Sequence, residues 1–185
     1  YFGYGSNMWQ WQMSQRCPNS VYLGVGRLYG WRWIINERGY ANVVELKAGK
    51  DNRSDSTSIQ KQGREGKDAN AADNSVYGLV YTLTESDEAN LDLIESVPQA
   101  YTKETHEVEL WPSPGMRKPV NMDLAPRKVM MLTYVDRKRV TEARPQDEYV
   151  SRLNTGLIDA LKEGVPKEWI DRVIRMFIPE TKEDD

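Results

Sequence analysis

The sequence predicts one domain, residues 1–185, that combines strands with helices. Short runs rich in aromatic and β-branched residues recur as far as residue 135, which is typical of strands. From residue 149 onward, apolar residues recur at helical spacing instead. A chain of 185 residues can bury one sizeable core and is too short for two comfortable domains.

The predicted strands follow one another with short connections. The opening residues form a short strand that runs into a tight Gly-Ser-Asn turn, and 36–39 forms a second turn. Gly24 and Gly26 are expected to bend the long strand 21–35. The later strands are expected at 40–46, 76–83, 101–111 and 127–135, with a loop at 112–126.

Helix signals appear first in the N-terminal half of the chain. Residues 9–18 carry tryptophans and a methionine among polar residues, so a turn or short helix is expected there. A capping pattern at Thr84 begins a helix over 85–97, and Pro98 ends it.

The C-terminal helices are predicted over 147–178. Gly164 is expected to end the first of them, and Pro166 opens the second, where its missing N–H is harmless. Their apolar faces either cover the strands or form a dimer interface, and the oligomeric state is left open by the sequence.

Residues 47–75 differ in character from the rest, because Lys, Asp, Asn, Ser, Gln and Gly dominate and Ile59 is the only large aliphatic residue. Such a segment cannot bury enough apolar area to offset the entropy lost on ordering. We expect a mobile polar insertion, and a lid that orders over a ligand is the alternative.

Composition argues against several classes of protein. The chain has 25 basic and 28 acidic residues, a net charge of −3, and so lacks the basic footprint of a nucleic-acid-binding protein. It has no signal-peptide pattern and no apolar run of about 18 residues that predicts a membrane span. The single Cys17 cannot form an intramolecular disulfide. We expect a soluble, cytoplasmic protein with no nucleic-acid or membrane partner.

Metal and cofactor motifs are also missing from the sequence. One histidine and one cysteine cannot supply a four-ligand zinc site, and no EF-hand, phosphate-binding or dinucleotide-binding pattern is present. No metal and no cofactor are therefore expected. His106 lies mid-strand among glutamates and is expected to be a surface or partly buried residue, and Cys17 a packed or exposed thiol.

The opening loop and one glutamate are the candidates for chemistry. Backbone N–H groups at the Gly5-Ser6-Asn7 turn can bind an anion such as a carboxylate, although an ordinary strand with a turn is the alternative. Glu95 lies on or next to the apolar side of the predicted helix 85–97. Partial desolvation would raise its pKa toward that of a proton shuttle, whereas a rim glutamate is the alternative.

Several motifs in this chain occur in a characteristic order. They are Tyr4-Gly5-Ser6-Asn7-Met8, Gly30-Trp31-Arg32-Trp33, Gly39-Tyr40-Ala41-Asn42, Val76-Tyr77-Gly78-Leu79-Val80-Tyr81, and Leu91-Asp92-Leu93-Ile94-Glu95 followed by Tyr101. The first is moderately specific alone and strongly specific in combination with the strand and helix motifs. Together, over residues 1 to about 135, they resemble the γ-glutamylcyclotransferase family, whose fungal members include enzymes that act on glutathione-derived adducts in secondary metabolism.

The resemblance implies an α+β fold around a small, mixed β-barrel with flanking helices and a substrate cavity at one mouth. Glu95 matches the acid/base of the family, and the opening loop would hold the α-carboxylate of a γ-glutamyl substrate. The implied substrate-binding residues are Tyr4, Gly5, Ser6, Asn7, Met8, Tyr134 and Tyr149. From the residues alone, both Tyr134 and Tyr149 default to packing.

Two features depart from the family pattern. The family commonly has Glu-Gly where this chain has Glu95-Ser96, so Ser96 must tolerate a backbone conformation that glycine relieves. The polar insertion 47–75 is also long for the family.

The implied reaction releases 5-oxoproline, as a lyase or acyltransferase of glutathione metabolism. Glu95 takes a proton from the α-ammonium of the substrate, the freed amine attacks its own γ-carbonyl, and Glu95 returns the proton to the departing amine. Backbone donors of the loop 5–7 bind the α-carboxylate or steady the developing oxyanion.

The leaving group and the type of activity remain open at this point. The substrate is a γ-glutamyl amino acid, glutathione or a glutathione adduct of a secondary metabolite. Four tryptophans either pack in the core or help to accommodate a bulkier substrate: Trp9, Trp11, Trp31 and Trp33. A non-catalytic module that binds a small ligand or a protein on the same fold is the alternative function.

Overall fold

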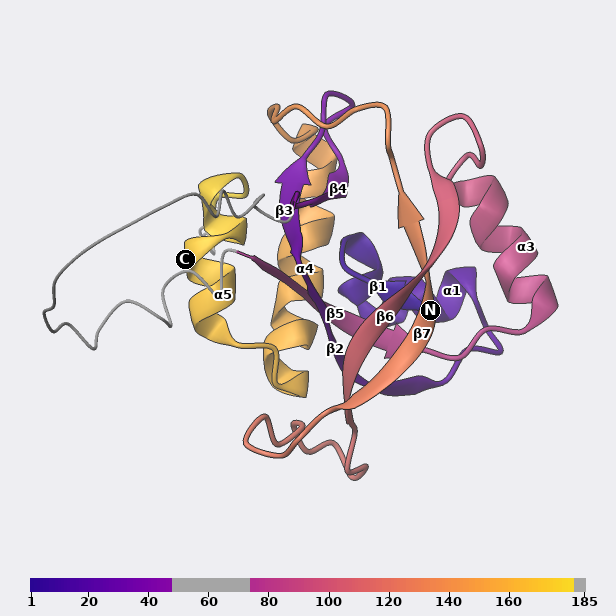
Figure 1. Cartoon of the computed structure of the whole chain (residues 1–185), viewed down its shortest axis with the longest axis vertical. Coiled ribbons are helices and arrows are strands. Elements are labelled where there is room, and N and C mark those ends of the chain that lie inside the picture. The colour runs from indigo at the N-terminus through magenta and orange to yellow at the C-terminus, as the bar shows by residue number, and fades with distance from the viewer. Residues whose placement is uncertain (48–73, 182–185) are drawn as a thin grey trace, which may run out of the picture.

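The computed structural model describes residues 1–47 and 74–181 of the chain. Its strands are β1 (Phe2–Gly3), β2 (Tyr22–Tyr29), β3 (Trp31–Ile35), β4 (Ala41–Glu45), β5 (Ser75–Tyr81), β6 (Thr102–Pro112) and β7 (Arg127–Val135). Its helices are α1 (Gln10–Arg16), α3 (Glu85–Ile94), α4 (Asp147–Glu163) and α5 (Lys167–Arg172), with 3₁₀ turns η1 (Ser6–Met8) and η2 (Ile174–Met176). The α+β class is confirmed (Figure 1).

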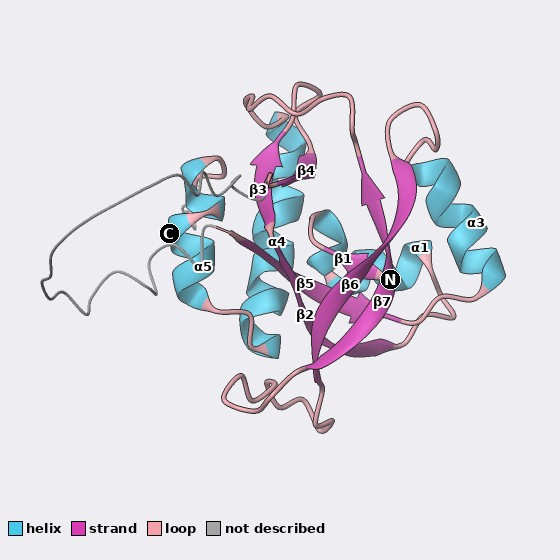
Figure 2. Ribbon diagram, in the orientation of Figure 1, coloured by secondary structure: helices cyan, strands magenta, loops and turns pink. Residues whose placement is uncertain are grey.

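A five-stranded sheet in the order β1-β5-β2-β6-β7 forms the centre of the fold. Strands β3 and β4 form a separate two-stranded sheet. All pairs among the described strands are antiparallel, and the larger sheet is strongly curled, so the expected barrel takes the form of an antiparallel half-barrel (Figure 2). The edge strand β1 pairs with β5 at Phe2 and Gly3, which fixes the start of the opening loop.

The predicted long strand 21–35 is two strands in the structure, which corrects the sequence interpretation. The chain breaks at Gly30, whose φ of +85° is a left-handed conformation that residues with a Cβ rarely adopt. Strand β2 belongs to the large sheet and β3 to the small one, so the break changes the sheet as well as the direction. A register shift between Tyr22 and Gly24 in the pairing of β2 with β5 lies at the first of the two glycines where a bend was expected.

The C-terminal helices pack against the chain's own core, as one of the two alternatives predicted. Helix α4 buries Tyr149, Leu153 and Leu157, and α5 buries Trp169 and Ile170. Gly164 ends α4 in a left-handed conformation, as expected. Helices α4 and α5 lie on one side of the curled sheet, and α1 and α3 lie on the other (Figure 1).

Helix α3 ends three residues earlier than predicted, at Ile94. Glu95 becomes its C-cap residue, and Ser96 takes a left-handed conformation with φ +51°. Ser96 thus has the unfavourable backbone conformation that was expected for the residue after Glu95. Of the predicted apolar face only Leu91 is fully buried, and Leu93 is 79% exposed, because residues two apart project from different sides of a helix.

The predicted mobile insertion 47–75 lies almost wholly outside the described residues, and only its ends are placed. Ser75 begins β5, and the backbone of Gly30 donates a hydrogen bond to the carbonyl of Asn74 (2.8 Å). Among the described helices, none combines the length and the apolar character needed to span a bilayer.

The left-handed turn at Ser96 predicts a gain in stability when glycine replaces serine. A Cβ in this conformation is unfavourable, so Ser96→Gly should raise the free energy of unfolding by about 1 kcal/mol. Ser151→Gly is the matched control, because Ser151 is exposed within α4 and the same change there should lower stability by about 0.5 kcal/mol. Urea unfolding measures both, and equal losses at the two sites would contradict the argument.

Candidate active site

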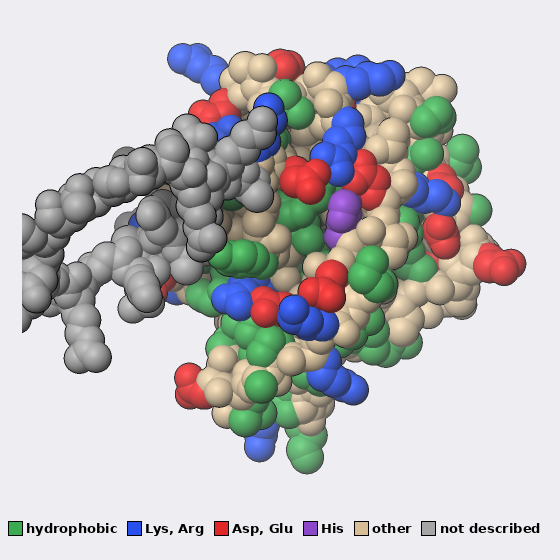
Figure 3. Space-filling model, viewed as in Figure 1, with side chains coloured by type: hydrophobic (Ala, Val, Ile, Leu, Met, Phe, Trp, Pro, Cys, Tyr) green, Lys and Arg blue, Asp and Glu red, His purple; other side chains and the backbone are tan. Residues whose placement is uncertain are grey.

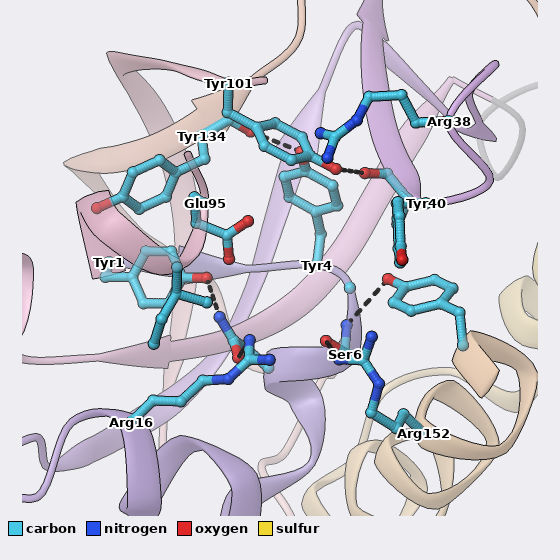
Figure 4. Close-up of a pocket in the computed structure, with 15 residues that line it drawn as sticks. Tyr1, Tyr4, Ser6, Arg16, Arg38, Tyr40, Glu95, Tyr101, Tyr134 and Arg152 are labelled. Atoms are coloured by element: carbon cyan, nitrogen blue, oxygen red, sulfur yellow. Dashed lines mark hydrogen bonds between the residues drawn. The ribbon is translucent and has the colours of Figure 1, made fainter. Parts of the chain in front are cut away.

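A cavity of about 230 Å³ opens at one end of the half-barrel, where segments far apart in the sequence meet (Figure 4). It is rich in phenol and guanidinium groups. Its lining residues are Tyr1, Tyr4, Gly5, Ser6, Asn7, Arg16, Arg38, Tyr40, Ala41, Ile94, Glu95, Tyr101, Tyr134, Tyr149 and Arg152. They come from the opening loop, α1, the β3–β4 turn, the end of α3, the start of β6, β7 and α4.

The residues expected at the site are brought together with one exception. The opening loop, the end of α3, β7 and α4 contribute Tyr4, Gly5, Ser6, Asn7, Glu95, Tyr134 and Tyr149 to the cavity. Met8 does not line it: the 3₁₀ turn η1 directs its side chain into the core, where it is fully buried. Its expected contact with a substrate therefore has no support in the geometry.

The opening loop presents backbone donors to the cavity. The N–H of Ser6 donates to the Tyr149 hydroxyl (3.2 Å), whereas those of Gly5 and Asn7 donate to no other described residue. Gly5 has no room for a side chain, because a Cβ there would lie 2.8 Å from the Tyr149 oxygen. The glycine thus permits the close approach of the loop to α4, and two N–H groups remain available for an anion.

Buried side chains hold this loop from behind. The Gln12 amide donates to the hydroxyl of Ser6 (3.0 Å) and to the side-chain oxygen of Asn7 (3.1 Å). The Asn7 amide in turn donates to the Tyr1 hydroxyl (2.8 Å), and Trp33 donates to the backbone carbonyl of Tyr4 (3.0 Å). These bonds fix the loop before a ligand arrives, which lowers the entropy lost on binding.

Glu95 is half-buried, and its carboxylate points into the cavity from the end of α3 (Figure 4). It makes no hydrogen bond or ion pair with another described side chain. Desolvation raises the pKa of this carboxyl above the ordinary glutamate value, although the charges of Arg16, Arg152 and Arg38 act in the opposite direction. A carboxylate with a raised pKa and no partner can accept a proton and return it.

The tyrosines of the cavity differ in where their hydroxyl protons go. Tyr4 donates to the backbone carbonyl of Tyr134 (2.5 Å), Tyr101 to that of Ala41 (2.8 Å), Tyr134 to Asp92 (2.7 Å) and Tyr40 to Glu148 (3.0 Å). The hydroxyl of Tyr149 instead accepts a bond and donates to no described residue. Burial raises its pKa to about 12, so this phenol stays neutral and its proton is available to a ligand.

Sequence reasoning missed the three arginines of the cavity. Arg16 ends α1, Arg38 lies in the turn between β3 and β4, and Arg152 lies one helical turn after Tyr149 in α4. The available signals were weak: Arg38 directly precedes the Gly39–Asn42 motif, and Arg152 shares a helix face with Tyr149. Tyr101 was recognised as part of a motif but was given no role.

Residues excluded from the site lie elsewhere in the fold. His106 is partly buried in β6 and bonds Glu104 (2.7 Å), on a face where acidic and basic side chains intermingle (Figure 3). Cys17 is buried. Of the four tryptophans, Trp31 and Trp33 are core residues and Trp11 is 59% exposed, and none of the four lines the cavity. Within residues 1–47 and 74–181, no group of acidic, His or Cys side chains is arranged to hold a metal ion.

Comparisons with known proteins identify structures that share this fold. No protein-family profile and no curated protein sequence matches this chain. A solved structure described as a γ-glutamyl cyclotransferase aligns over 100% of this chain and 90% of its own, with a TM-score of 0.66 and 16% identity. An uncharacterized human protein aligns to the same extent with a TM-score of 0.66 and 17% identity. YkqA from Bacillus subtilis aligns over 98% of this chain and 55% of its own, at 0.62 and 19%.

These similarities define the architecture as the γ-glutamyl cyclotransferase-like α+β fold. The resemblance noted in the sequence motifs is confirmed at this level. The fold places a cavity where the motif residues converge, and the side chains of that cavity determine its chemistry.

The raised pKa of Glu95 predicts a pH-dependent effect of Glu95→Gln on stability. A carboxyl with a higher pKa in the folded state stabilises the fold below its unfolded-chain pKa, and this stabilisation is lost as pH rises through the folded-state pKa. The free energy of unfolding of Glu95→Gln should therefore rise relative to wild type as the pH increases above about 4, the ordinary pKa of a glutamate in an unfolded chain. Urea unfolding at several pH values measures it.

Glu85→Gln is the control, because Glu85 is an exposed carboxylate at the start of the same helix. A stability difference between Glu95→Gln and wild type that stays flat or shrinks with rising pH would contradict the desolvation of Glu95.

Proposed function

We propose that this protein is a γ-glutamyl cyclotransferase that releases 5-oxoproline. The observation that carries the proposal is the unpaired Glu95 carboxylate, with its raised pKa, facing a loop with free backbone N–H groups in one polar cavity. The fold supports the same activity, because a structure described as a γ-glutamyl cyclotransferase shares it.

In the proposed reaction the nucleophile belongs to the substrate, and Glu95 moves protons between the two nitrogens of the substrate. The carboxylate accepts a proton from the α-ammonium of the γ-glutamyl group, and the amine attacks the γ-carbonyl carbon to close a five-membered ring. Glu95 then delivers the proton to the departing nitrogen as the amide C–N bond breaks. The ring nitrogen, which still carries two hydrogens, loses one of them to the regenerated Glu95 carboxylate, and this second proton leaves with the released amine. The raised pKa of Glu95 suits both directions of transfer, and holding the substrate folded supplies much of the acceleration.

In this proposal the opening loop binds the α-carboxylate of the substrate. The free N–H groups of Gly5 and Asn7 are flanked by two guanidinium groups: Arg16 bonds the Asn7 side chain (2.9 Å), and Arg152 lies 3.3 Å from the Ser6 hydroxyl. This concentration of donors and positive charge suits a full anion. The neutral Tyr149 hydroxyl, which has a proton to donate, is assigned to the developing oxyanion of the γ-carbonyl.

A non-catalytic binding module is the alternative function, and the cavity supports it less well. A site that only binds an anionic ligand gains nothing from a desolvated carboxylate that faces the ligand without a partner of its own. The tryptophans give no support to a site for a bulky adduct, because none of Trp9, Trp11, Trp31 and Trp33 lines the cavity. Cyclisation of glutathione or of a smaller γ-glutamyl compound is therefore favoured over cyclisation of a bulky adduct.

Release of 5-oxoproline tests the proposal. Wild-type protein should release it from at least one of γ-glutamylalanine, γ-glutamylethylamine, glutathione and an S-conjugate of glutathione. Glu95→Gln should keep the fold and lower kcat by roughly 10²- to 10⁴-fold, because it can neither accept nor return the proton. Glu85→Gln, on the same helix and exposed, is the matched control and should retain wild-type turnover. Wild-type turnover by Glu95→Gln would reject the assigned acid/base.

A further inference from the structure

The cavity carries more positive charge than its own carboxylates balance. Arg152 is bonded to Glu148 through two nitrogens (2.8 and 3.1 Å). The guanidinium of Arg16 bonds only the neutral side chain of Asn7, and that of Arg38 makes no hydrogen bond or ion pair with another described residue. Glu95 is the one acidic residue among the lining residues that the structure describes. Two unpaired cations thus face one carboxylate.

The backbone and two aromatic rings hold Arg38 in place. Its N–H donates to the side-chain oxygen of Asn36 (3.1 Å), and its carbonyl accepts a bond from Gln146 (2.9 Å). The guanidinium carbon lies 5.6 Å from the ring centre of Tyr40 and 6.0 Å from that of Tyr101. The rings restrict the side chain and leave its N–H donors free for an anion.

Arg38 lies across the cavity from the opening loop and Arg16 (Figure 4). In the proposed reaction, the α-carboxylate is held at the loop and the α-ammonium faces Glu95, so a γ-glutamyl group adds no net charge. A carboxylate on the leaving amine adds one negative charge. That negative charge complements the unpaired guanidinium of Arg38, which lies on the side of the cavity opposite the opening loop.

We propose that Arg38 binds the carboxylate of the leaving group and so selects γ-glutamyl amino acids and peptides over γ-glutamyl amines that lack this carboxylate. The inference rests on the proposed function for the γ-glutamyl half of the substrate. Arg38 is a specificity-determining residue in this account, and it takes no part in proton transfer.

Binding measured separately from turnover tests this role. γ-Glutamylalanine and γ-glutamylethylamine differ by the leaving-group carboxylate, and calorimetric titration of the Glu95→Gln protein measures affinity for each. We expect γ-glutamylalanine to bind at least roughly tenfold more tightly, as charge-assisted hydrogen bonds require. Arg38→Gln in the same background should abolish this ratio, and Arg38→Lys should restore part of it.

Arg32→Gln is the matched control, because Arg32 is half-exposed on β3, pairs with Glu142 and does not line the cavity. In the Glu95→Gln background, Arg32→Gln should keep the affinity ratio of the Glu95→Gln protein. Circular dichroism establishes that each variant is folded. Removal of the Arg38 charge also alters the electrostatic potential in the rest of the cavity, but this affects the shared γ-glutamyl half of both ligands alike and cancels in the ratio.

The outcomes separate the two proposals. Equal affinities, or a preference that survives Arg38→Gln, would overturn the role of Arg38 even if wild-type protein releases 5-oxoproline. A preference that depends on Arg38 in a protein without turnover would uphold the carboxylate contact and reject the cyclotransferase proposal. Failure of both ligands to bind would overturn the contact as well.

Discussion

The site depends on a carboxylate that is held partly out of water without a partner. Desolvation of Glu95 favours its protonated form, and only the longer-range attraction of three arginines opposes this. A direct ion pair would lower the pKa and occupy the oxygens that a substrate needs. The fold avoids one by pairing Arg152 with Glu148 and by directing Arg16 to a neutral amide. The carboxylate therefore remains free to move a proton.

The placement of Glu95 follows from how α3 ends. The left-handed turn at Ser96 stops the helix immediately after the glutamate, so the side chain leaves the last turn and enters the cavity. Across the cavity, Gly5 allows the loop to lie against the Tyr149 hydroxyl. The left-handed residue Ser96 and the absence of a side chain at Gly5 thus position the two facing sides of the site. Both are local features with consequences for distant parts of the chain.

Much of this was predictable from the sequence, and the remainder has physical reasons for being missed. The strand at 127–135 and the helix end at Gly164 were predicted correctly, because β-branched runs and C-terminal glycines act locally. The interruption at Gly30 was missed because both sides have strand-like composition, and only tertiary structure assigns them to different sheets. Arg16, Arg38 and Arg152 were missed because a long cationic side chain is normally solvated. Their convergence depends on topology rather than on spacing.

The central claim is that the substrate's own amine, and not water, attacks the γ-carbonyl. Turnover of γ-glutamylalanine in water enriched in oxygen-18, followed by mass spectrometry of the products, tests it most directly. Intramolecular attack predicts 5-oxoproline that carries no oxygen from the solvent, together with free alanine. Formation of glutamate with one solvent-derived oxygen would show hydrolysis and contradict the account.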